Sequence, residues 1–203
     1  LIANARLSGE IEGGKLVLKD KNTKSALHVA LQQGVLNAAP GERVQLNLTG
    51  AIDAVPIAIS LRSATAKDLI NPALRVPFDL SIEAVQTRLA LSGTLDRDID
   101  ARDVELAMQI SGPHLEYLNP LLRVSLPPWG PWSAAGQFRM SRSGYAVNQL
   151  KLQVGSSTLT GRGVLETISG QAKLDIALAA PLIQLDDFKT GGWSATGDGS
   201  MPL

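Results

Sequence analysis

The sequence predicts a mainly β protein, built of antiparallel strands with one or two short helices. Apolar and polar residues alternate with a period of two along most of the chain, as in 104–110, where Val104, Leu106, Met108 and Ile110 would share one face of a sheet. These runs recur every 10 to 15 residues or so, which suits hairpins and leaves no room for the helical crossovers that parallel strands need. Gly, Asp, Asn and Ser lie between them, as is typical of turns.

The alternating runs mark roughly eleven strands, each with one aliphatic and one polar side. In chain order they are 5–11, 15–20, 26–32, 43–50, 56–63, 87–93, 103–111, 135–141, 148–154, 157–165 and 173–179.

Two stretches favour helix. Residues 64–70 are long enough for one or two turns, and 111–122 carry a leucine stripe. In the second stretch Ser111 is placed to cap the helix and Pro113 to occupy its first turn. Because Pro120 interrupts that pattern, Asn119 is an alternative cap for a second short turn.

One short motif occurs twice, as "LINPALRV" at 69–76 and "YLNPLLRV" at 117–124. Each copy follows a short helical stretch and precedes a strand. A second recurring motif, Leu followed by Ser or Thr and then by Gly, ends several strands. Recurring strand units predict a repeat architecture. We therefore expect residues 1–203 to be a single β-rich repeat segment of a longer protein, with units at 43–93 and 94–165. Arg75 and Arg123 of the motif would pair with carboxylates or meet phosphate headgroups.

Composition excludes several classes of function. The 203 residues include 19 Lys plus Arg and 19 Asp plus Glu, so there is no basic field to attract nucleic acid. There is no cysteine and there are only two histidines, His28 and His114, which disfavours a zinc site. Asp96, Asp98 and Asp100 have calcium-loop spacing, but Ala101 and Ala107 stand where Gly and Glu are needed. Without any nucleophile or nucleotide motif, the chain is expected not to be an enzyme and to use no cofactor.

The segment "LPPWGPW" at 126–132 admits two interpretations. Its tryptophans would anchor at a membrane interface, or they would belong to a rigid loop that closes the end of the sheet. The second is the favoured interpretation.

The aliphatic side of the strands is the most informative feature, because so large an apolar surface must be covered. Either the sheet packs against another sheet in a closed sandwich, or it curls into a trough lined by aliphatic side chains. A trough of that kind would suit acyl chains, which need dispersion contacts and no specific polar partner. Alternation alone leaves both arrangements open.

Residues 85–178 resemble the C-terminal part of the AsmA family of bacterial envelope proteins. The resemblance lies in a Gly-Pro and short leucine helix (112–118), a proline-rich loop (126–131) and the pattern Val154, Gly155, Ser156, Leu159 and Gly161. The later "LIQLDDF" at 182–188 also fits. The family's N-terminal membrane anchor has no counterpart among these residues, and we expect it to lie outside this piece of the protein.

The resemblance implies an elongated, curved antiparallel sheet with a hydrophobic groove, related to TamB and the bridge-like lipid carriers. It also implies a periplasmic protein, tethered to the inner membrane in its full-length form, that carries phospholipid toward the outer membrane and maintains envelope integrity. The alternative is a scaffold module that assists outer-membrane protein assembly through strand edges and other envelope protein partners. The side chains expected to contact acyl chains are Leu46, Leu48, Ile57, Ile59, Leu106, Met108, Ile110, Leu150, Leu152 and Val154.

Overall fold

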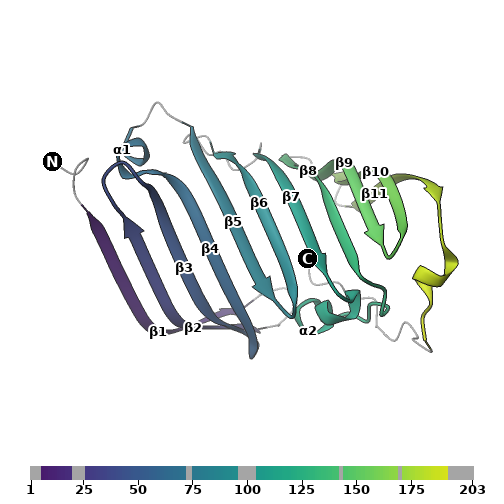
Figure 1. The fold of residues 1–203 in the computed structure, drawn as a ribbon, viewed down its shortest axis with the longest axis horizontal. Coiled ribbons are helices and arrows are strands. Elements are labelled where there is room, and N and C mark those ends of the chain that lie inside the picture. Colours follow the sequence, from purple (N-terminus) through teal and green to yellow (C-terminus); the bar gives the residue numbers. More distant parts are fainter. Residues whose placement is uncertain are drawn as a thin grey trace.

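The computed structural model describes residues 6–19, 26–71, 75–95, 104–141, 144–168 and 171–191. Within these ranges eleven strands form one antiparallel sheet, in which spatial order follows chain order from β1 to β11 (Figure 1). The strands are β1 (Leu7–Lys19), β2 (Ala26–Ala38), β3 (Arg43–Ile52), β4 (Val55–Thr65), β5 (Val76–Ala84), β6 (Thr87–Leu95), β7 (Val104–Gly112), β8 (Trp132–Ser141), β9 (Gly144–Val154), β10 (Ser157–Ile168) and β11 (Gln171–Leu182). The helical turns are α1 (Ala66–Leu69), η2 (Leu115–Leu118), α2 (Asn119–Leu122) and η3 (Leu185–Phe188).

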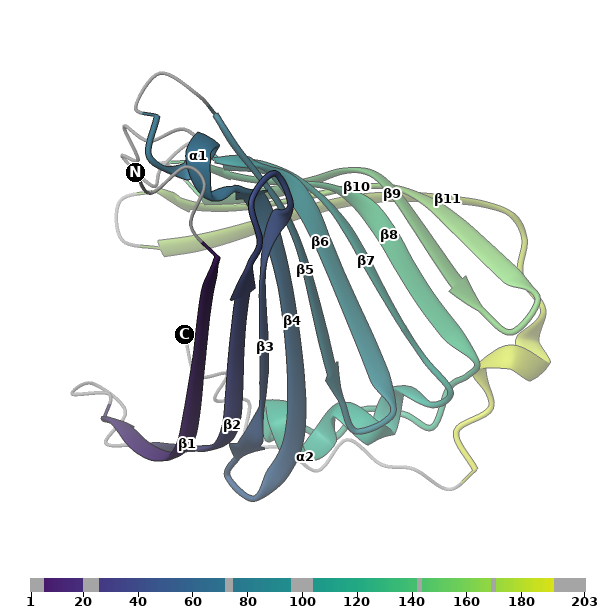
Figure 2. The ribbon, with the colours of Figure 1, turned by 60° about the vertical axis from the view of Figure 1, so that its left-hand side comes forward.

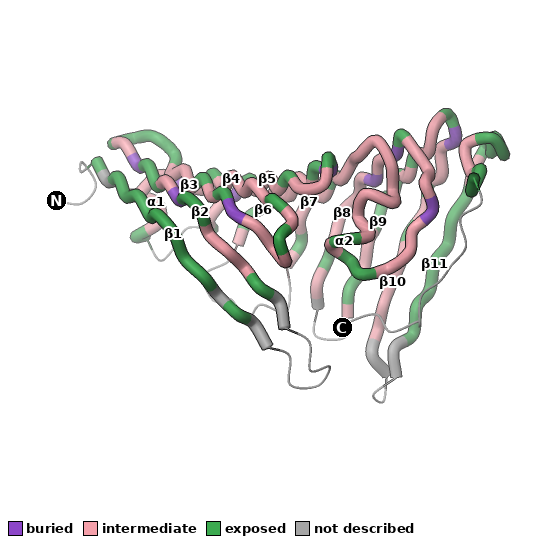
Figure 3. The backbone as a smooth tube through the Cα atoms, turned by 90° about the horizontal axis from the view of Figure 1, so that it is seen from below, coloured by how far each residue is buried: buried purple, intermediate pink, exposed green. Residues whose placement is uncertain are grey.

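The sheet is open, and the predicted antiparallel architecture is confirmed. The outer strands β1 and β2 at one edge and β10 and β11 at the other bend toward the same side, so that the sheet forms a trough (Figures 2 and 3). The accessible surface of 13732 Å² is well above the roughly 9,100 Å² expected of a compact monomer of 21.4 kDa. The alternative of a closed sandwich is therefore wrong for this chain.

Bulges bend the strands and keep the apolar residues on one face. β2 carries an extra residue between Leu31 and Gln33 relative to β3, and β9 carries one at Gln149, whose φ is 51°. A bulge shifts the alternation by one residue and increases the local bend. Val147 before the bulge and Leu150 after it consequently face the same side. We call this side the trough face and the opposite side the polar face.

Residues 113–131, which we call the end segment, join β7 to β8 and include η2 and α2. α2 lies on the side toward which the sheet bends, at one end of the strands (Figures 2 and 3). Trough-face residues at this end are buried, with Thr87 6%, Trp132 9% and Ser157 1% exposed, as are Ala38 and Ala64 at the opposite end of the strands. The end segment therefore forms a wall across the trough, as the loop interpretation of "LPPWGPW" predicted.

Sequence and structure differ in local details. The described parts of the runs 5–11 and 15–20, residues 7–11 and 15–19, belong to the single strand β1. The strand that follows the first NPxLRV motif is β5, which is not one of the predicted runs. Ser111 does not cap a helix, because β7 continues to Gly112 and the first helical turn starts at Leu115. Asn119 does not act as the N-cap either: its Oδ1 accepts a hydrogen bond from the Leu126 backbone N–H at 2.8 Å.

Candidate functional site

The trough face is built by cross-strand register. Because directly opposed residues of neighbouring strands point to the same side, a run of partners defines a row across the sheet. One row crosses ten strands and spans roughly 43 Å at the usual strand spacing. It consists of Ile11, Gly34, Leu48, Ile59, Ile82, Leu89, Ile110, Ala134, Leu152 and Leu159. A parallel row consists of Gly9, Leu36, Leu46, Leu61, Leu80, Leu91, Met108 and Gly136.

The structure places all ten side chains expected to contact acyl chains on the trough face. Leu46 and Leu48 on β3 lie opposite Leu61 and Ile59 on β4, and Ile57 lies opposite Gly50. The four expected residues on β3 and β4 form one group, and the six on β7 and β9 form a second group whose two strands are joined by β8. The strands β5 and β6 lie between the two groups and connect them. The linking residues, which the expected set omits, are Leu80, Ile82, Leu89 and Leu91. Their signal was the same period-two alternation in "FDLSIEA" and "TRLALSG".

These aliphatic side chains do not form a closed core. Among the described residues the buried aliphatic and aromatic side chains are those of Ala38, Ala64, Phe78, Trp132 and Ala134, and Pro127 of the end segment is also buried. The middle of the trough face is half-buried, and its two edges are open, with Ile11 55% and Ile176 55% exposed. The face therefore offers a continuous apolar lining that is accessible from one side, and Figure 3 shows that most of the arch is half-buried or exposed, with only isolated buried segments.

Glycine is part of this lining. Gly50 and Gly161 are the last residues of two copies of the motif Leu, then Ser or Thr, then Gly, and both occupy trough-face positions. A Cβ at Gly50 would overlap the carbonyl oxygen of Ala30, and one at Gly161 would overlap that of Ala177. Adjacent backbones therefore approach closely at these points, which only glycine permits.

At the wall of the trough, η3 contacts both the turn between β9 and β10 and the end segment. Asp187 of η3 accepts hydrogen bonds from the backbone N–H groups of Ser156 and Ser157 at 3.0 and 2.8 Å, and from the Ser157 hydroxyl at 2.7 Å. The Ser157 hydroxyl in particular holds the pKa of the Asp187 carboxyl below its usual range. Trp129 of the end segment packs edge-on against Phe188, with ring centroids 5.1 Å apart.

An ion pair between Arg123 and Asp53 connects the end segment to the β3–β4 hairpin. Arg123 Nη2 donates to Asp53 Oδ2 at 2.6 Å, and the His28 backbone N–H donates to Asp53 Oδ1 at 2.9 Å. These two donors, the His28 N–H foremost, lower the pKa of Asp53. Arg123 of the second NPxLRV motif thus pairs with a carboxylate. Part of the first motif, residues 72–74, lies outside the described residues, as does the expected charged turn with Asp96, Asp98 and Asp100.

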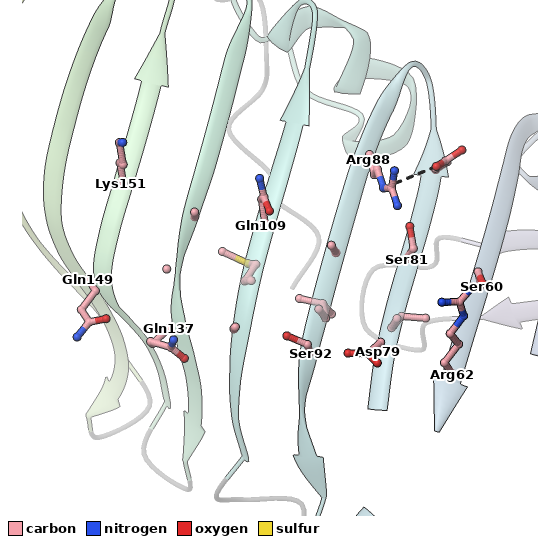
Figure 4. Close-up of a pocket in the computed structure, with 18 residues that line it drawn as sticks. Ser60, Arg62, Asp79, Ser81, Arg88, Ser92, Gln109, Gln137, Gln149 and Lys151 are labelled. Atoms are coloured by element: carbon pink, nitrogen blue, oxygen red, sulfur yellow. Dashed lines mark ion pairs between the residues drawn. The ribbon is translucent and has the colours of Figure 1, made fainter. Parts of the chain in front are cut away.

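The polar face has a shallow hollow of about 780 Å³ (Figure 4). Small side chains such as Ser81 and Ser92 form its floor, while Arg62, Gln137 and Lys151 stand around it. Cross-strand ion pairs lie on the same face, among them Arg139 with Glu105 at 3.1 Å and Arg88 with Glu83 at 3.7 Å. The two faces therefore differ sharply: the polar face suits water, and the trough face suits hydrocarbon.

Neither a metal nor a membrane-spanning helix is indicated by the residues that the structure describes. No group of three or more His, Asp or Glu in these ranges is placed to hold a metal ion. No helix in the same ranges has the length and apolarity needed to cross a membrane. Comparison with protein-family models, with curated proteins and with solved structures finds no match to this chain.

Proposed function

We propose that this chain is a segment of an AsmA-like protein of the bacterial envelope that binds phospholipid acyl chains on its trough face. The observation that carries the proposal is the pair of aliphatic rows that cross the sheet without a charged residue and without a covering layer. Hydrocarbon is the ligand class that fits such a surface, since it needs only apolar contact. The resemblance of residues 85–178 to the AsmA family supports the same ligand.

The geometry indicates how an acyl chain would lie. The rows run across the strands, so a chain that follows them passes from strand to strand and keeps contact with aliphatic side chains throughout. The end segment blocks travel along the strands at one end. In this proposal transport is passive: the trough shields hydrocarbon from water between the inner and outer membranes. An exposed chain of about sixteen carbons would cost on the order of 10 kcal/mol.

The full-length protein would act in the periplasm, tethered to the inner membrane, and no catalytic residue is needed. The test is extraction of the purified protein with organic solvent, followed by mass spectrometry of the extract. We expect phospholipid to copurify with the chain, and Leu152→Asp to abolish that copurification in a folded variant. Gln153→Asp places the same carboxylate one residue away on the polar face and serves as the control.

Absence of phospholipid from the natural sequence would contradict the proposal. That result would instead favour the scaffold module that assists outer-membrane protein assembly, for which the apolar face needs no lipid.

A further inference from the structure

The end segment covers its end of the trough in a way that leaves three polar atoms without hydrogen bonds. Thr87 Oγ1, Trp132 Nε1 and Trp129 Nε1 of the end segment are buried out of reach of water, and no described residue pairs with any of them. Thr87 Oγ1 and Trp132 Nε1 lie 2.9 and 3.1 Å from the position that a Cβ on Gly112 would occupy, directly before the segment begins. A buried polar group without a partner destabilises the state that buries it. Opening of this region would give all three atoms hydrogen bonds that the closed arrangement denies them.

The end segment is a self-contained loop. Its flanking residues Gly112 and Trp132 are cross-strand partners, so the loop starts and finishes at adjacent positions of the sheet. Within it the Leu115 N–H donates to the Trp129 carbonyl oxygen at 2.8 Å. Its two helical turns, η2 and α2, contact each other more than they contact any strand. A compact loop that is closed at its base and bonded within itself can move as one body.

The helical turns of the segment are loosely held against the sheet. No residue of η2 or α2 is buried. A hollow of about 410 Å³ lies between them and the β5–β6 turn, with Gln86 of the turn and Glu116 of η2 among the residues that line it. The ion pair between Arg123 and Asp53 is partly exposed, and exposed pairs add little stability. The segment can therefore separate from the sheet without uncovering an apolar core under η2 and α2.

We propose that the end segment is a lid, which lifts from the sheet about its two ends and closes again. Lifting breaks the ion pair with Asp53 and the ring contact with Phe188. It exposes Thr87, Trp129 and Trp132 to hydrogen-bond partners and opens the trough along the strands. Hydrocarbon then reaches the aliphatic rows from the end of the strands as well as from the open side. This role in loading rests on the proposed function, whereas the movement itself does not.

Hydrogen exchange at two indole N–H groups measures the movement without lipid. The N–H groups of Trp129 and Trp132 are followed by NMR in the natural sequence, and we expect both to exchange faster than the most protected amides of the sheet, which exchange through global unfolding. A lid that lifts only when the whole protein unfolds would give equal opening free energies for the indoles and those amides, and this result would overturn the proposal.

A cross-link across the hollow provides the matched control. The sequence has no cysteine, so Gln86→Cys and Glu116→Cys together offer a specific pair for a short bismaleimide. We expect the cross-link to slow exchange of both indole N–H groups by about ten-fold or more relative to the same double variant before cross-linking. Equal exchange before and after cross-linking would overturn the lid.

Thr87→Val tests the energetic argument, because it replaces the unpaired hydroxyl with a methyl group of similar size. We expect a more stable protein in urea and indole exchange slower by about ten-fold. Thr65→Val is the control, since the Thr65 hydroxyl donates to Asp68 Oδ2 at 2.8 Å and accepts from the Asp68 N–H at 3.2 Å. That variant should be less stable than the natural sequence. Destabilisation by Thr87→Val as well would count against the lid.

Lipid loading separates the lid from the proposed function. Transfer of a phospholipid with a fluorescent acyl chain should be slower to the cross-linked variant than to the same variant before cross-linking, with equal affinity at equilibrium. Equal transfer rates would overturn the role of the lid in loading. If the natural sequence binds no lipid, the proposed function fails, and indole exchange still decides whether the lid moves.

Discussion

Replacing Leu106 with Asp is the sharpest test of the trough face by mutation. Leu106 is half-buried on β7, with Gly93 of β6 and Phe138 of β8 as its cross-strand partners. An acyl chain that follows the row would lose contact with about four methylene groups there, worth roughly 3 kcal/mol at ~0.8 kcal/mol per CH₂. That loss corresponds to a decrease in affinity of about 100-fold, before the cost of desolvating the carboxylate is added.

Titration with a phospholipid that carries a fluorescent acyl chain measures this decrease. Ala107→Asp is the control, because residue 107 is the next one along β7 and lies on the polar face. Circular dichroism and urea unfolding establish that both variants fold. Because Leu106 is only half-buried, its replacement should cost about 1 to 2 kcal/mol of stability. Equal lipid affinity of folded Leu106→Asp and Ala107→Asp would refute the assignment of the trough face as the binding surface.

Three further predictions concern the sheet and its end wall. Gly50→Ala should lower the free energy of unfolding by about 1 to 3 kcal/mol because its Cβ meets the Ala30 carbonyl, whereas Gly9→Ala, with its nearest contact at 3.8 Å, should be neutral in urea unfolding. Folding lowers the pKa of Asp187, so its ionised carboxylate should stabilise the fold above the ordinary pKa of 3.8, and this stabilisation should be lost as the pH falls through and below that value. Asp187→Asn should therefore flatten the acid limb of a curve of unfolding free energy against pH. An unchanged acid limb would contradict the hydrogen bond assigned to Ser157. Arg123 has a φ of 54°, in the left-handed region that glycine adopts without strain. Arg123→Ala and Arg123→Gly both lose the ion pair with Asp53, but only the alanine variant keeps the strain, so its melting temperature should be lower by an amount equivalent to about 1 kcal/mol. A higher melting temperature for the alanine variant would count against that strain.

The antiparallel sheet was predictable from the sequence because each strand has its own period-two signal. Val104, Leu106, Met108 and Ile110 alternate without interruption, and the structure keeps that alternation on one face of β7. The trough-face residues followed from the same signal. Curvature did not follow from it, because alternation is the same for a flat, a curled and a closed sheet. The bulges that bend this sheet, such as the one at Gln149, appear in the sequence only as a slip in the alternation.

The end wall was the least predictable part of the molecule. It depends on contacts between segments far apart in the sequence, namely Trp129 with Phe188 and Ser157 with Asp187. Nothing local in "LDDF" indicates that its second carboxylate will accept hydrogen bonds from a turn 30 residues earlier. Similarly, Arg123 was recognisable as part of a repeated motif, but its partner Asp53, 70 residues away, was not.

The proposed function requires the uncovered aliphatic face to hold hydrocarbon. Photo-cross-linking with a phospholipid that carries a photoreactive group in its acyl chain, followed by peptide mapping at single-residue resolution, locates the bound chain on the sheet. We expect adducts on Leu106, Met108 and Ile110 of β7 and none on Glu105, Ala107 and Gln109, which face the other side. Adducts spread over both faces, or confined to the polar hollow, would contradict it.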